Sequence, residues 1–377
     1  MNRNVHIYFS EMRNESRIFK IVATLIKNRV FDEIFVVGRV GKNLPERELL
    51  HDGVTILRID APLFSLLVKV SAMRVALWYV ATLIQLVRLA PHCLSVHSVS
   101  LLPMALAVKV MRPGLKIIYE THELETETNG ASQNKKRMRS WLERLVMPAV
   151  SQTVTVSPSI CNWYAARYRN NEVSLVMNCP QFHPRQDSDY LRQHFSFAAD
   201  TVIFLYQGIM FPGRGIEKLV EAFERLPKSA VLVLLGYGPD FDKWYAVSQG
   251  SERIFVHTAV PVDRVLSLTA SADCGISFFE DTCLSHRFAL PNKLFEFIQA
   301  RLPVIVSPTT DQSQLVMDMQ IGLVCESFEV NAVVKACESF LNNPPEKIDA
   351  RLDLAASLHS WEMQEERVLR VYAAKAR

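Results

Sequence analysis

Short apolar runs alternate along the chain with longer segments whose apolar residues recur every three or four positions. The runs are typical of buried strands, and the longer segments are typical of helices packed on a sheet. Residues 5–9 and 54–59 are such runs, whereas 16–28 carries its apolar residues on one helical face. Strands that alternate with helices predict a parallel sheet covered by helices, which is an α/β doubly wound, Rossmann-like domain.

The alternation occurs twice, on either side of a polar, irregular stretch at 170–200. We therefore expect two tandem domains, 1–180 and 181–358, followed by a helix, 359–377, that crosses back to the first domain. The expected strands are 5–9, 33–38, 54–59, 94–98, 116–123, 153–157, 201–207, 230–236, 254–257, 274–278, 304–307 and 322–325. The expected helices are 16–28, 63–90, 101–111, 137–149, 158–169, 215–226, 240–248, 261–271, 291–301, 311–318, 330–342 and 360–375.

Composition limits the possible partners. The 377 residues are 49% apolar and 21% charged, with a net charge of +3, which is too mild a basic balance to indicate nucleic acid. The seven cysteines include no C-x-x-C pair, and the chain opens without a signal peptide, so we expect reduced thiols and a cytoplasmic protein. The apolar stretch 63–89 and the basic cluster 135–139 predict peripheral contact with the inner face of an anionic cytoplasmic membrane; a core helix and a solvated charge run are equally good interpretations.

Several enzyme classes lack their motifs here. There is no Walker A sequence, no G-x-G-x-x-G after a strand, no G-x-S-x-G and no H-E-x-x-H. Nicotinamide dehydrogenases, serine hydrolases and zinc proteases are therefore disfavoured. No D-x-D in a strand context is present to hold a metal, so neither metal nor cofactor is expected.

The best candidate for a phosphate-binding loop is the segment 207–217, which runs from an expected strand into an expected helix. Gly208, Gly213 and Gly215 would let backbone N–H groups approach an anion at the helix N-terminus. Arg214 adds a planar fork of donors that suits a diphosphate. The alternative is an ordinary strand-to-helix turn with a solvated arginine.

A second polar feature lies in the segment ALPNKLFEFIQARLPVI at 289–305. At 100° per residue, Asn292, Lys293 and Glu296 share one helical side, opposite an apolar side that packs on the sheet. A lysine near a helix start is disfavoured by the helix dipole unless it meets an anion. Glu296 could accept hydrogen bonds from neighbouring hydroxyls such as those of a ribose. A surface ion pair is the alternative.

With these motifs in order, nearly the whole chain resembles the retaining GT-B glycosyltransferases of family 4, particularly their bacterial polysaccharide members. The resemblance implies two facing Rossmann-like domains with the donor nucleotide on the second. The motifs that carry it are N-E-S-R-I at 14–18, V-H-S at 96–98, Y-E-T-H-E-L at 119–124, T-V-S at 155–157, R-G-I-E at 214–217, L-G-Y-G-P at 235–239, A-D-C-G-I at 272–276, L-P-N-K-L-F-E at 290–296 and L-P-V-I-V-S at 302–307.

The resemblance also assigns residues on the donor side. Glu296 matches the second Glu of the family's E-x7-E pair, which holds the nucleotide ribose, but Phe288 replaces the first Glu. Arg214 stands where the family has a lysine that contacts the diphosphate. Ile209 stands near the usual position of an arginine, so that Lys293 would supply the missing charge. The expected donor-binding residues are Gly208, Gly213, Arg214, Gly215, Gly236, Asn292, Lys293 and Glu296.

On the first domain, His97 matches a strand-end histidine near the transferred sugar, and His122 with Glu123 matches a second strand-end pair. The resemblance therefore implies His97, His122, Glu123, Arg214 and Lys293 as the catalytic residues. A structural, hydrogen-bonded role is the alternative for each histidine.

The expected reaction moves a sugar from a UDP- or GDP-linked donor to a hydroxyl of a glycan, with the anomeric configuration retained. We expect the acceptor to be lipid-linked, in capsule, O-antigen or exopolysaccharide assembly. Two alternatives remain: a GT-B nucleotide-sugar epimerase, and a nucleotide-sugar-binding module with impaired catalysis, which the replacement of the first Glu and of the arginine would fit.

Overall fold

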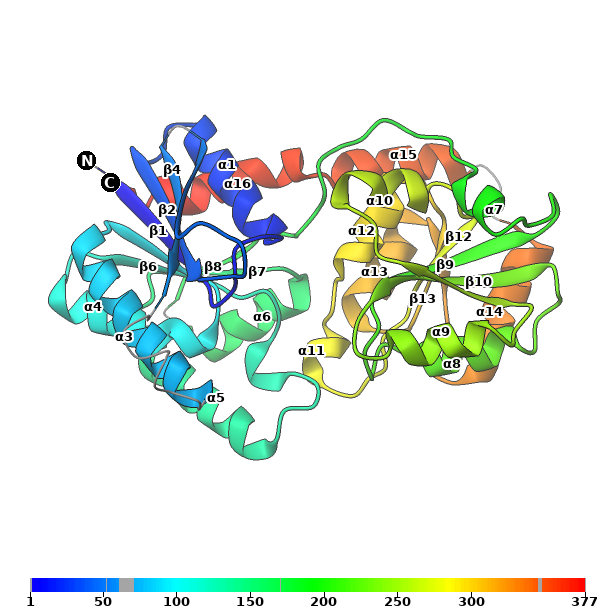
Figure 1. Ribbon diagram of the computed structural model, residues 1–377, viewed down its shortest axis with the longest axis horizontal. Helices are drawn as coiled ribbons and strands as arrows, with labels where there is room; N and C mark the ends of the chain where they lie inside the picture. The colour runs from blue at the N-terminus through cyan, green and yellow to red at the C-terminus, as the bar shows by residue number, and fades with distance from the viewer. Residues whose placement is uncertain (1, 52, 61–70, 170, 345–347, 377) are drawn as a thin grey trace. The chain divides into compact units, whose positions relative to one another are not determined.

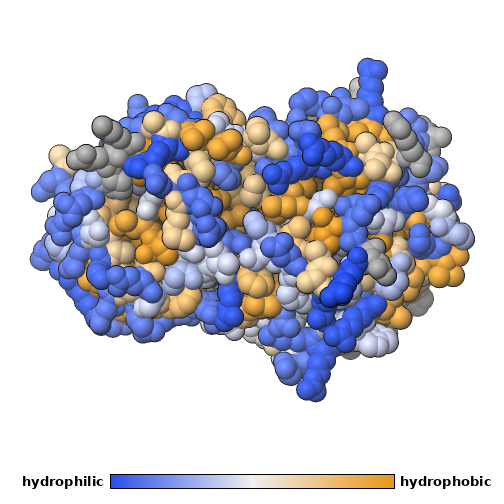
Figure 2. All heavy atoms as spheres, turned by 180° about the vertical axis from the view of Figure 1, so that it is seen from behind, coloured by the Kyte–Doolittle hydropathy of each residue, from blue (hydrophilic) through white to orange (hydrophobic). Residues whose placement is uncertain are grey.

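The structure is a computed structural model that describes all residues except 1, 52, 61–70, 170, 345–347 and 377 (Figure 1). It divides into two compact units. Unit 1 comprises 1–177 together with 364–377, and unit 2 comprises 178–363. The face shown in Figure 2 mixes apolar patches with hydrophilic side chains over both units, the usual pattern of a water-facing surface.

The described part of unit 1 is built on an eight-stranded sheet in the order β3-β4-β2-β1-β5-β6-β7-β8, in which only the β3–β4 pair is antiparallel. Its strands are β1 (Arg3–Ile7), β2 (Glu33–Arg39), β3 (Arg47–His51), β4 (Val54–Ile59), β5 (Cys93–Val96), β6 (Lys116–Glu120), β7 (Gln152–Thr155) and β8 (Val173–Leu175). Its helices are α1 (Ser16–Lys27), α3 (Ser71–Leu89), α4 (Leu102–Met111), α5 (Gln133–Val146) and α6 (Pro158–Arg167), with 3₁₀ turns η1 (Val99–Leu101), η2 (Glu125–Glu127) and η3 (Met147–Ala149).

The described part of unit 2 contains a six-stranded parallel sheet in the order β11-β10-β9-β12-β13-β14. Its strands are β9 (Val202–Ile209), β10 (Ala230–Tyr237), β11 (Ile254–Thr258), β12 (Cys274–Ser277), β13 (Val304–Val306) and β14 (Gly322–Val324). Its helices are α7 (Tyr190–His194), α8 (Ile216–Phe223), α9 (Phe241–Ser248), α10 (Val262–Thr269), α11 (Leu284–Arg287), α12 (Asn292–Gln299), α13 (Thr310–Met319), α14 (Val330–Asn342) and α15 (Ile348–Leu358). Both units are therefore α/β Rossmann-like folds, as the alternation predicts.

The expected strands are all present, with ends that move by a few residues. The largest changes relevant to function are at β6, which ends at Glu120 rather than residue 123, and at β1, which ends at Ile7 rather than residue 9. Of the helix expected at 63–90, the structure describes α3, and 63–70 lie outside the described residues. The elements not anticipated are short or lack an apolar pattern; they are β3, β8, α7, α11 and α15.

The C-terminal helix α16 (Trp361–Ala373) packs on unit 1 through its residues from Gln364 onward. Val368 and Tyr372 are buried there, and Leu369 is half-buried. The Tyr372 hydroxyl lies 3.1 Å from Glu120 Oε1, to which it donates a hydrogen bond, and 3.0 Å from Ser95 Oγ. The last helix is thereby tied to the carboxyl end of β6.

Glu120 also forms a buried ion pair in unit 1. Its Oε2 lies 3.0 Å from an Arg17 guanidinium nitrogen, and the two side chains are only 1% and 4% exposed. Arg17 donates a further hydrogen bond to the carbonyl of Val176 at 2.8 Å. One carboxylate thus links α1, β6 and α16.

Removing the Glu120 carboxylate should strongly destabilise unit 1. Glu120→Ala leaves Arg17 buried without its counter-ion, which costs about 3–5 kcal/mol in the free energy of unfolding. Glu366→Ala on α16 removes an exposed pair with Arg370 and should hardly change it. Urea denaturation of both variants checks this, and equal effects would contradict the role of the buried pair.

Candidate functional site

The glycine-spaced loop of unit 2 faces the first turn of α12. Gly208, near the end of β9, has φ of +120°, and a Cβ placed on it would lie 3.6 Å from Lys293 Cε and 3.9 Å from Nζ. The structure therefore brings together the two segments that the sequence singled out separately. They meet at the carboxyl end of the parallel sheet, where such folds bind ligands.

Lys293 is buried, with 9% of its surface exposed, and its ammonium has no hydrogen-bond partner in the described structure. The Nζ lies 3.6 Å from the ring centroid of Tyr206 and 5.6 Å from that of Phe279. Burial, reinforced by the charge of Arg214, holds the pKa of Lys293 well below its usual range, although Glu296 acts in the opposite direction. A buried cation of this kind is costly without an anion.

Arg214 is the second cation of this site. Its guanidinium carbon lies 4.6 Å from the Phe279 ring centroid, and its buried Nε also lacks a hydrogen-bond partner in the described structure. Arg214 and Lys293 therefore share one aromatic ring, which attracts both cations through its π face. Two unsatisfied cationic donors beside a glycine loop can bind an anion such as a diphosphate.

The loop geometry needs its glycines. Gly213 and Gly215 have φ of 86° and 72°, in the left-handed region that side chains disfavour. Gly215 is also the N-cap residue of α8, and a Cβ there would lie 2.3 Å from Phe278 Cδ1. The chain thus turns sharply enough to direct the α8 N-terminus, with its unpaired N–H groups, toward the loop.

Gly236 lies on β10, directly opposite Gly208 on β9. A Cβ on Gly236 would lie 1.9 Å from the carbonyl oxygen of Gly208. Gly236 therefore allows the two strands to pair closely at the place where the loop begins, and its packing supports the conformation of Gly208.

Glu296 is held by a chain of side-chain hydrogen bonds. Gln207 on β9 donates its amide hydrogen to Glu296 Oε2, and Thr269 donates to the Gln207 carbonyl oxygen at 2.8 Å. On the same helix, Asn292 accepts a 2.9 Å hydrogen bond from Asn178. The carboxylate thus has a fixed orientation one turn beyond Lys293.

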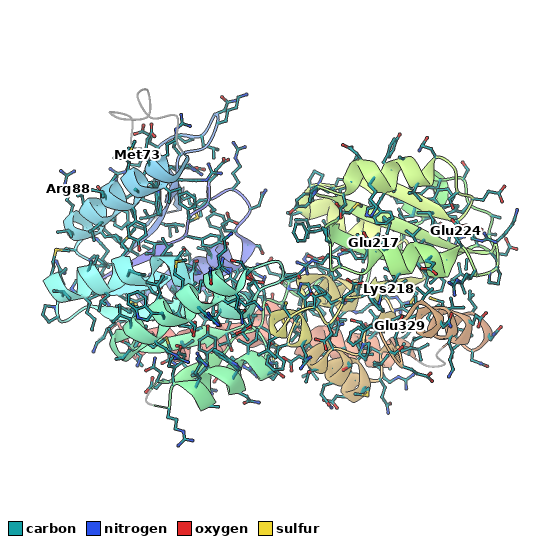
Figure 3. The ribbon with its side chains drawn as sticks, turned by 90° about the horizontal axis from the view of Figure 1, so that it is seen from below. Met73, Arg88, Glu217, Lys218, Glu224 and Glu329 are labelled. Carbon is teal, nitrogen blue, oxygen red and sulfur yellow. The ribbon has the colours of Figure 1, made fainter. Side chains whose placement is uncertain are left out.

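Lys218 is a second lysine of unit 2, and its contacts differ from those of Lys293. It lies in the first turn of α8, among carboxylates (Figure 3). Its Nζ lies 3.7 Å from Glu329 and 3.9 Å from Glu280, and it donates a 2.8 Å hydrogen bond to the carbonyl of Phe328. Lys218 is satisfied by the protein itself, in contrast with Lys293.

Three residues around Lys293 and Arg214 were missed from the sequence. Tyr206 and Phe279 hold the two cations, and His286 on α11 has its ring centroid 5.5 Å from that of Phe279. Burial, together with the charge of Arg214, lowers the pKa of His286. The two positions that depart from the family pattern lie nearby in sequence: Phe288 directly follows α11, and Ile209 is the exposed last residue of β9.

In unit 1, His97 and His122 follow the carboxyl ends of β5 and β6. His97 Nδ1 lies 3.0 Å from His122 Nε2, so the two rings are hydrogen-bonded. Burial lowers the pKa of His122 to about 3, and burial, reinforced by the charge of Arg17 and by the two neighbouring imidazoles, holds the pKa of His97 well below its usual range. Both imidazoles are therefore neutral at neutral pH.

Glu123, expected beside His122, is exposed. A half-buried carboxylate lies nearby on η2, where Glu125 accepts hydrogen bonds from Ser98 Oγ at 2.8 Å and from the Val99 N–H at 3.0 Å. Burial raises the pKa of Glu125 to about 7. Glu125 was missed because it lies beyond the strand-end motif, and the sequence gives no sign of its burial.

Comparison with known proteins assigns both halves of the chain. Residues 187–357 match the family model described as glycosyl transferases group 1, and residues 24–179 match the glycosyl transferase 4-like domain. Together the matches cover most of the chain. No curated protein sequence matches it significantly.

Solved structures share the fold at low sequence identity. Sucrose-phosphate synthase from Thermosynechococcus elongatus is 13% identical, with a TM-score of 0.79 over 99% of both chains. Anabaena HepE in complex with UDP-glucose is 13% identical, with a TM-score of 0.75 over 99% of this chain and 100% of that one. WaaG, a glycosyltransferase of lipopolysaccharide biosynthesis, is 16% identical, with a TM-score of 0.67 over 98% and 99%.

The fold is therefore GT-B, and the enzyme class is that of the hexosyltransferases. The chain belongs to the family 4-like GT-B glycosyltransferases. Among the described residues, every helix is too short or too polar to cross a bilayer, and no group of three His, Cys, Asp or Glu side chains is placed to hold a metal ion.

Replacing Lys293 with methionine should stabilise the ligand-free protein. Lys293→Met keeps the shape but removes an unpaired buried cation, a gain of about 1–3 kcal/mol in the free energy of unfolding. Lys218→Met should instead destabilise, because it strips a partner from two carboxylates and a carbonyl.

The stability difference between the native protein and Lys293→Met should depend on pH. Between the depressed folded-state pKa of Lys293 and its ordinary value of 10.5, the unfolded chain binds more protons, so native stability rises with pH. The advantage of Lys293→Met should therefore shrink as the pH approaches 10.5. Urea denaturation at several pH values measures this, and a destabilised Lys293→Met protein would show that the lysine is satisfied within the fold.

Proposed function

We propose that this enzyme transfers a hexose from a UDP-hexose to a hydroxyl of a lipid-linked glycan and retains the anomeric configuration. The observation that carries the proposal is the buried ammonium of Lys293 beside Gly208, together with the buried Nε of Arg214, because both lack a hydrogen-bond partner in the described structure. A diphosphate matches them in charge and in hydrogen-bonding need.

The donor would bind along unit 2 from the loop to α12. Its diphosphate would lie between Arg214, Lys293 and the N-terminus of α8, and its ribose hydroxyls would meet Glu296. Because Gln207 donates a hydrogen bond to the Glu296 carboxylate, the carboxylate oxygens that would accept from the ribose are oriented before the nucleotide binds. The complex of Anabaena HepE with UDP-glucose supports uracil as the base.

Catalysis would come chiefly from electrostatics. As the bond from the sugar to the nucleotide breaks, negative charge grows on the β-phosphate. Arg214 and Lys293 would stabilise that charge at fixed positions, in a site where the surrounding aromatic rings exclude water. In this proposal the reaction needs no metal, because the two side chains supply the positive charge.

Loss of either donor-binding group should sharply reduce transfer. Glu296→Ala and Lys293→Ala should each lower kcat/KM well over tenfold, corresponding to about 2–4 kcal/mol, if each acts as one lost preorganised contact. Lys335→Ala, which removes an exposed lysine of α14 paired with Glu326, is the control and should retain full activity. Near-normal rates for Glu296→Ala or Lys293→Ala would remove the site assignment.

The assay also separates the other candidate functions. A panel of nucleotide sugars is incubated with the enzyme and an extract of lipid-linked acceptors. Sugar on lipid supports transfer, an isomerised nucleotide sugar would indicate an epimerase, and binding with neither product would indicate an inactive module.

Exposed apolar residues on unit 1 support the proposal that the acceptor is linked to a lipid. Helix α4 packs between α3 and α5. Helix α3 carries Met73 near its start and Arg88 near its end (Figure 3), and its exposed apolar residues Val80, Ile84 and Val87 recur at helical spacing between them. The exposed large apolar residues of the three helices are Met73, Val75, Val80, Ile84, Val87, Val110, Met111, Met138, Trp141 and Leu145.

Basic residues accompany these apolar ones on α5, but the cluster 135–139 is only partly available. Lys136 pairs with Glu127 at 3.2 Å, and Arg139 donates to the carbonyl of Glu125 at 2.8 Å. Lys135 and Arg137 are exposed, as is Arg144 one turn beyond Trp141. Such a mixed apolar and basic surface suits an anionic bilayer.

Removing apolar contacts should release the enzyme from vesicles. Ile84→Ser combined with Trp141→Ser should abolish most flotation with vesicles containing phosphatidylglycerol at low salt. Val262→Ser, which changes an exposed apolar residue of unit 2, should leave it intact. The membrane proposal is wrong if the native enzyme does not float, or if all three proteins float equally.

A further inference from the structure

Three histidines form one hydrogen-bonded chain across the sheet of unit 1. His6 Nδ1 lies 2.9 Å from His97 Nε2, and His97 Nδ1 lies 3.0 Å from His122 Nε2. The residues belong to the neighbouring strands β1, β5 and β6, at or just beyond their carboxyl ends. The chain therefore leads from the interior of unit 1 to His122, which is partly exposed.

All three rings are neutral, which limits how their protons can be arranged. Burial lowers the pKa of His6 to about 3, and His97 and His122 are shifted in the same direction. A neutral imidazole has one N–H donor and one acceptor nitrogen. If both hydrogen bonds form, either every ring is protonated on Nδ1 or every ring is protonated on Nε2.

The inner end of the chain is closed. His6 Nε2 is buried and has no hydrogen-bond partner in the described structure. The ring stacks on Tyr372 at a centroid distance of 6.0 Å, but the Tyr372 hydroxyl is engaged by Ser95 and Glu120. A proton that entered the chain would find no exit at His6, so the chain sets orientation rather than conducting protons.

The closed end also selects between the two arrangements. With Nε2 protonation throughout, His6 would bury an N–H without an acceptor. With Nδ1 protonation throughout, it would bury only an unused lone pair. Orphaned buried N–H groups are rarer than under-used acceptors. The second arrangement leaves His122 with its proton on Nδ1, the nitrogen that the chain does not use.

We propose that His6 is a positioning residue that fixes His97 and His122 in their Nδ1–H forms, so that His122 offers a hydrogen-bond donor to the glycan acceptor. What the donor meets rests on the proposed function. The tautomeric order itself does not, because it follows from the ring distances and the buried end.

The direct test is ¹⁵N NMR of the histidine-labelled native protein, which distinguishes protonated from unprotonated ring nitrogens. The signals are assigned by comparison with His97→Gln and His122→Gln. Nδ1–H at both His97 and His122 is expected. Nε2–H at His122, or a mixture of the two forms, would overturn the proposal.

A matched pair of variants tests the part played by His6. His6→Asn keeps a donor near the position of Nδ1 and should preserve both the spectrum and kcat. His6→Leu keeps the bulk but donates nothing, so a mixture of tautomers and a fall in kcat of roughly tenfold are expected. An unchanged His97 and His122 spectrum in His6→Leu would overturn the assignment.

Affinity for UDP separates this role from general damage, because the proposed donor-binding residues lie in unit 2. The Kd of UDP should stay the same in both His6 variants, and circular dichroism should report an unchanged fold. If the native enzyme turns over no nucleotide sugar, the proposed function fails, whereas the NMR result still decides the order of the tautomers. A weakened Kd for UDP in His6→Leu with unchanged tautomers would make His6 a purely structural residue.

Discussion

An ammonium group buried without a hydrogen-bond partner is the constraint around which unit 2 is organised. Lys293 is kept from water by Tyr206 and Phe279, whose rings attract it but cannot accept a strong hydrogen bond from it. Such a group lowers the stability of the empty protein. The same group should bind an anion strongly, because the ammonium has already lost its water during folding and binding adds no further desolvation cost for it.

The surrounding features follow from that constraint. Gly208 leaves room beside the ammonium, and Gly215 turns the chain so that the α8 N-terminus faces the loop. Phe279 lies against the guanidinium of Arg214 as well as the ammonium, so the two repelling cations are held over one ring. Stability is lowered locally at the candidate site, whereas the strands beside it contribute many buried apolar residues to the core of unit 2.

The fold was largely predictable because buried parallel strands consist of consecutive apolar residues, which are easily recognised in a sequence. Strands such as β9 and β10 are almost entirely buried and stand out from their polar surroundings. β3, with the sequence RELLH, was missed because it is a short edge strand with an exposed Leu49 and no clear apolar pattern. The basic cluster at 135–139 looked uniform in sequence, yet folding engages Lys136 and Arg139 with neighbouring groups.

The candidate site was predictable only where a motif named the residue. Lys293, Glu296 and the glycines belong to local patterns, whereas Phe279, Tyr206 and His286 are brought to the site by the tertiary fold. His6 was hidden for another reason. It lies inside the otherwise apolar run 5–9, and its link to His97 joins positions 91 residues apart. Contacts of that range leave no periodic trace in a single sequence.

Calorimetry of UDP binding near pH 9, in two buffers of different ionisation enthalpy, tests the central claim about Lys293 most directly. Because burial depresses the pKa of Lys293, a bound diphosphate should restore its charge, and the protein should take up protons as it binds. We predict proton uptake by the native enzyme and none by Lys293→Met. Binding without proton uptake, or identical uptake by both proteins, would contradict it.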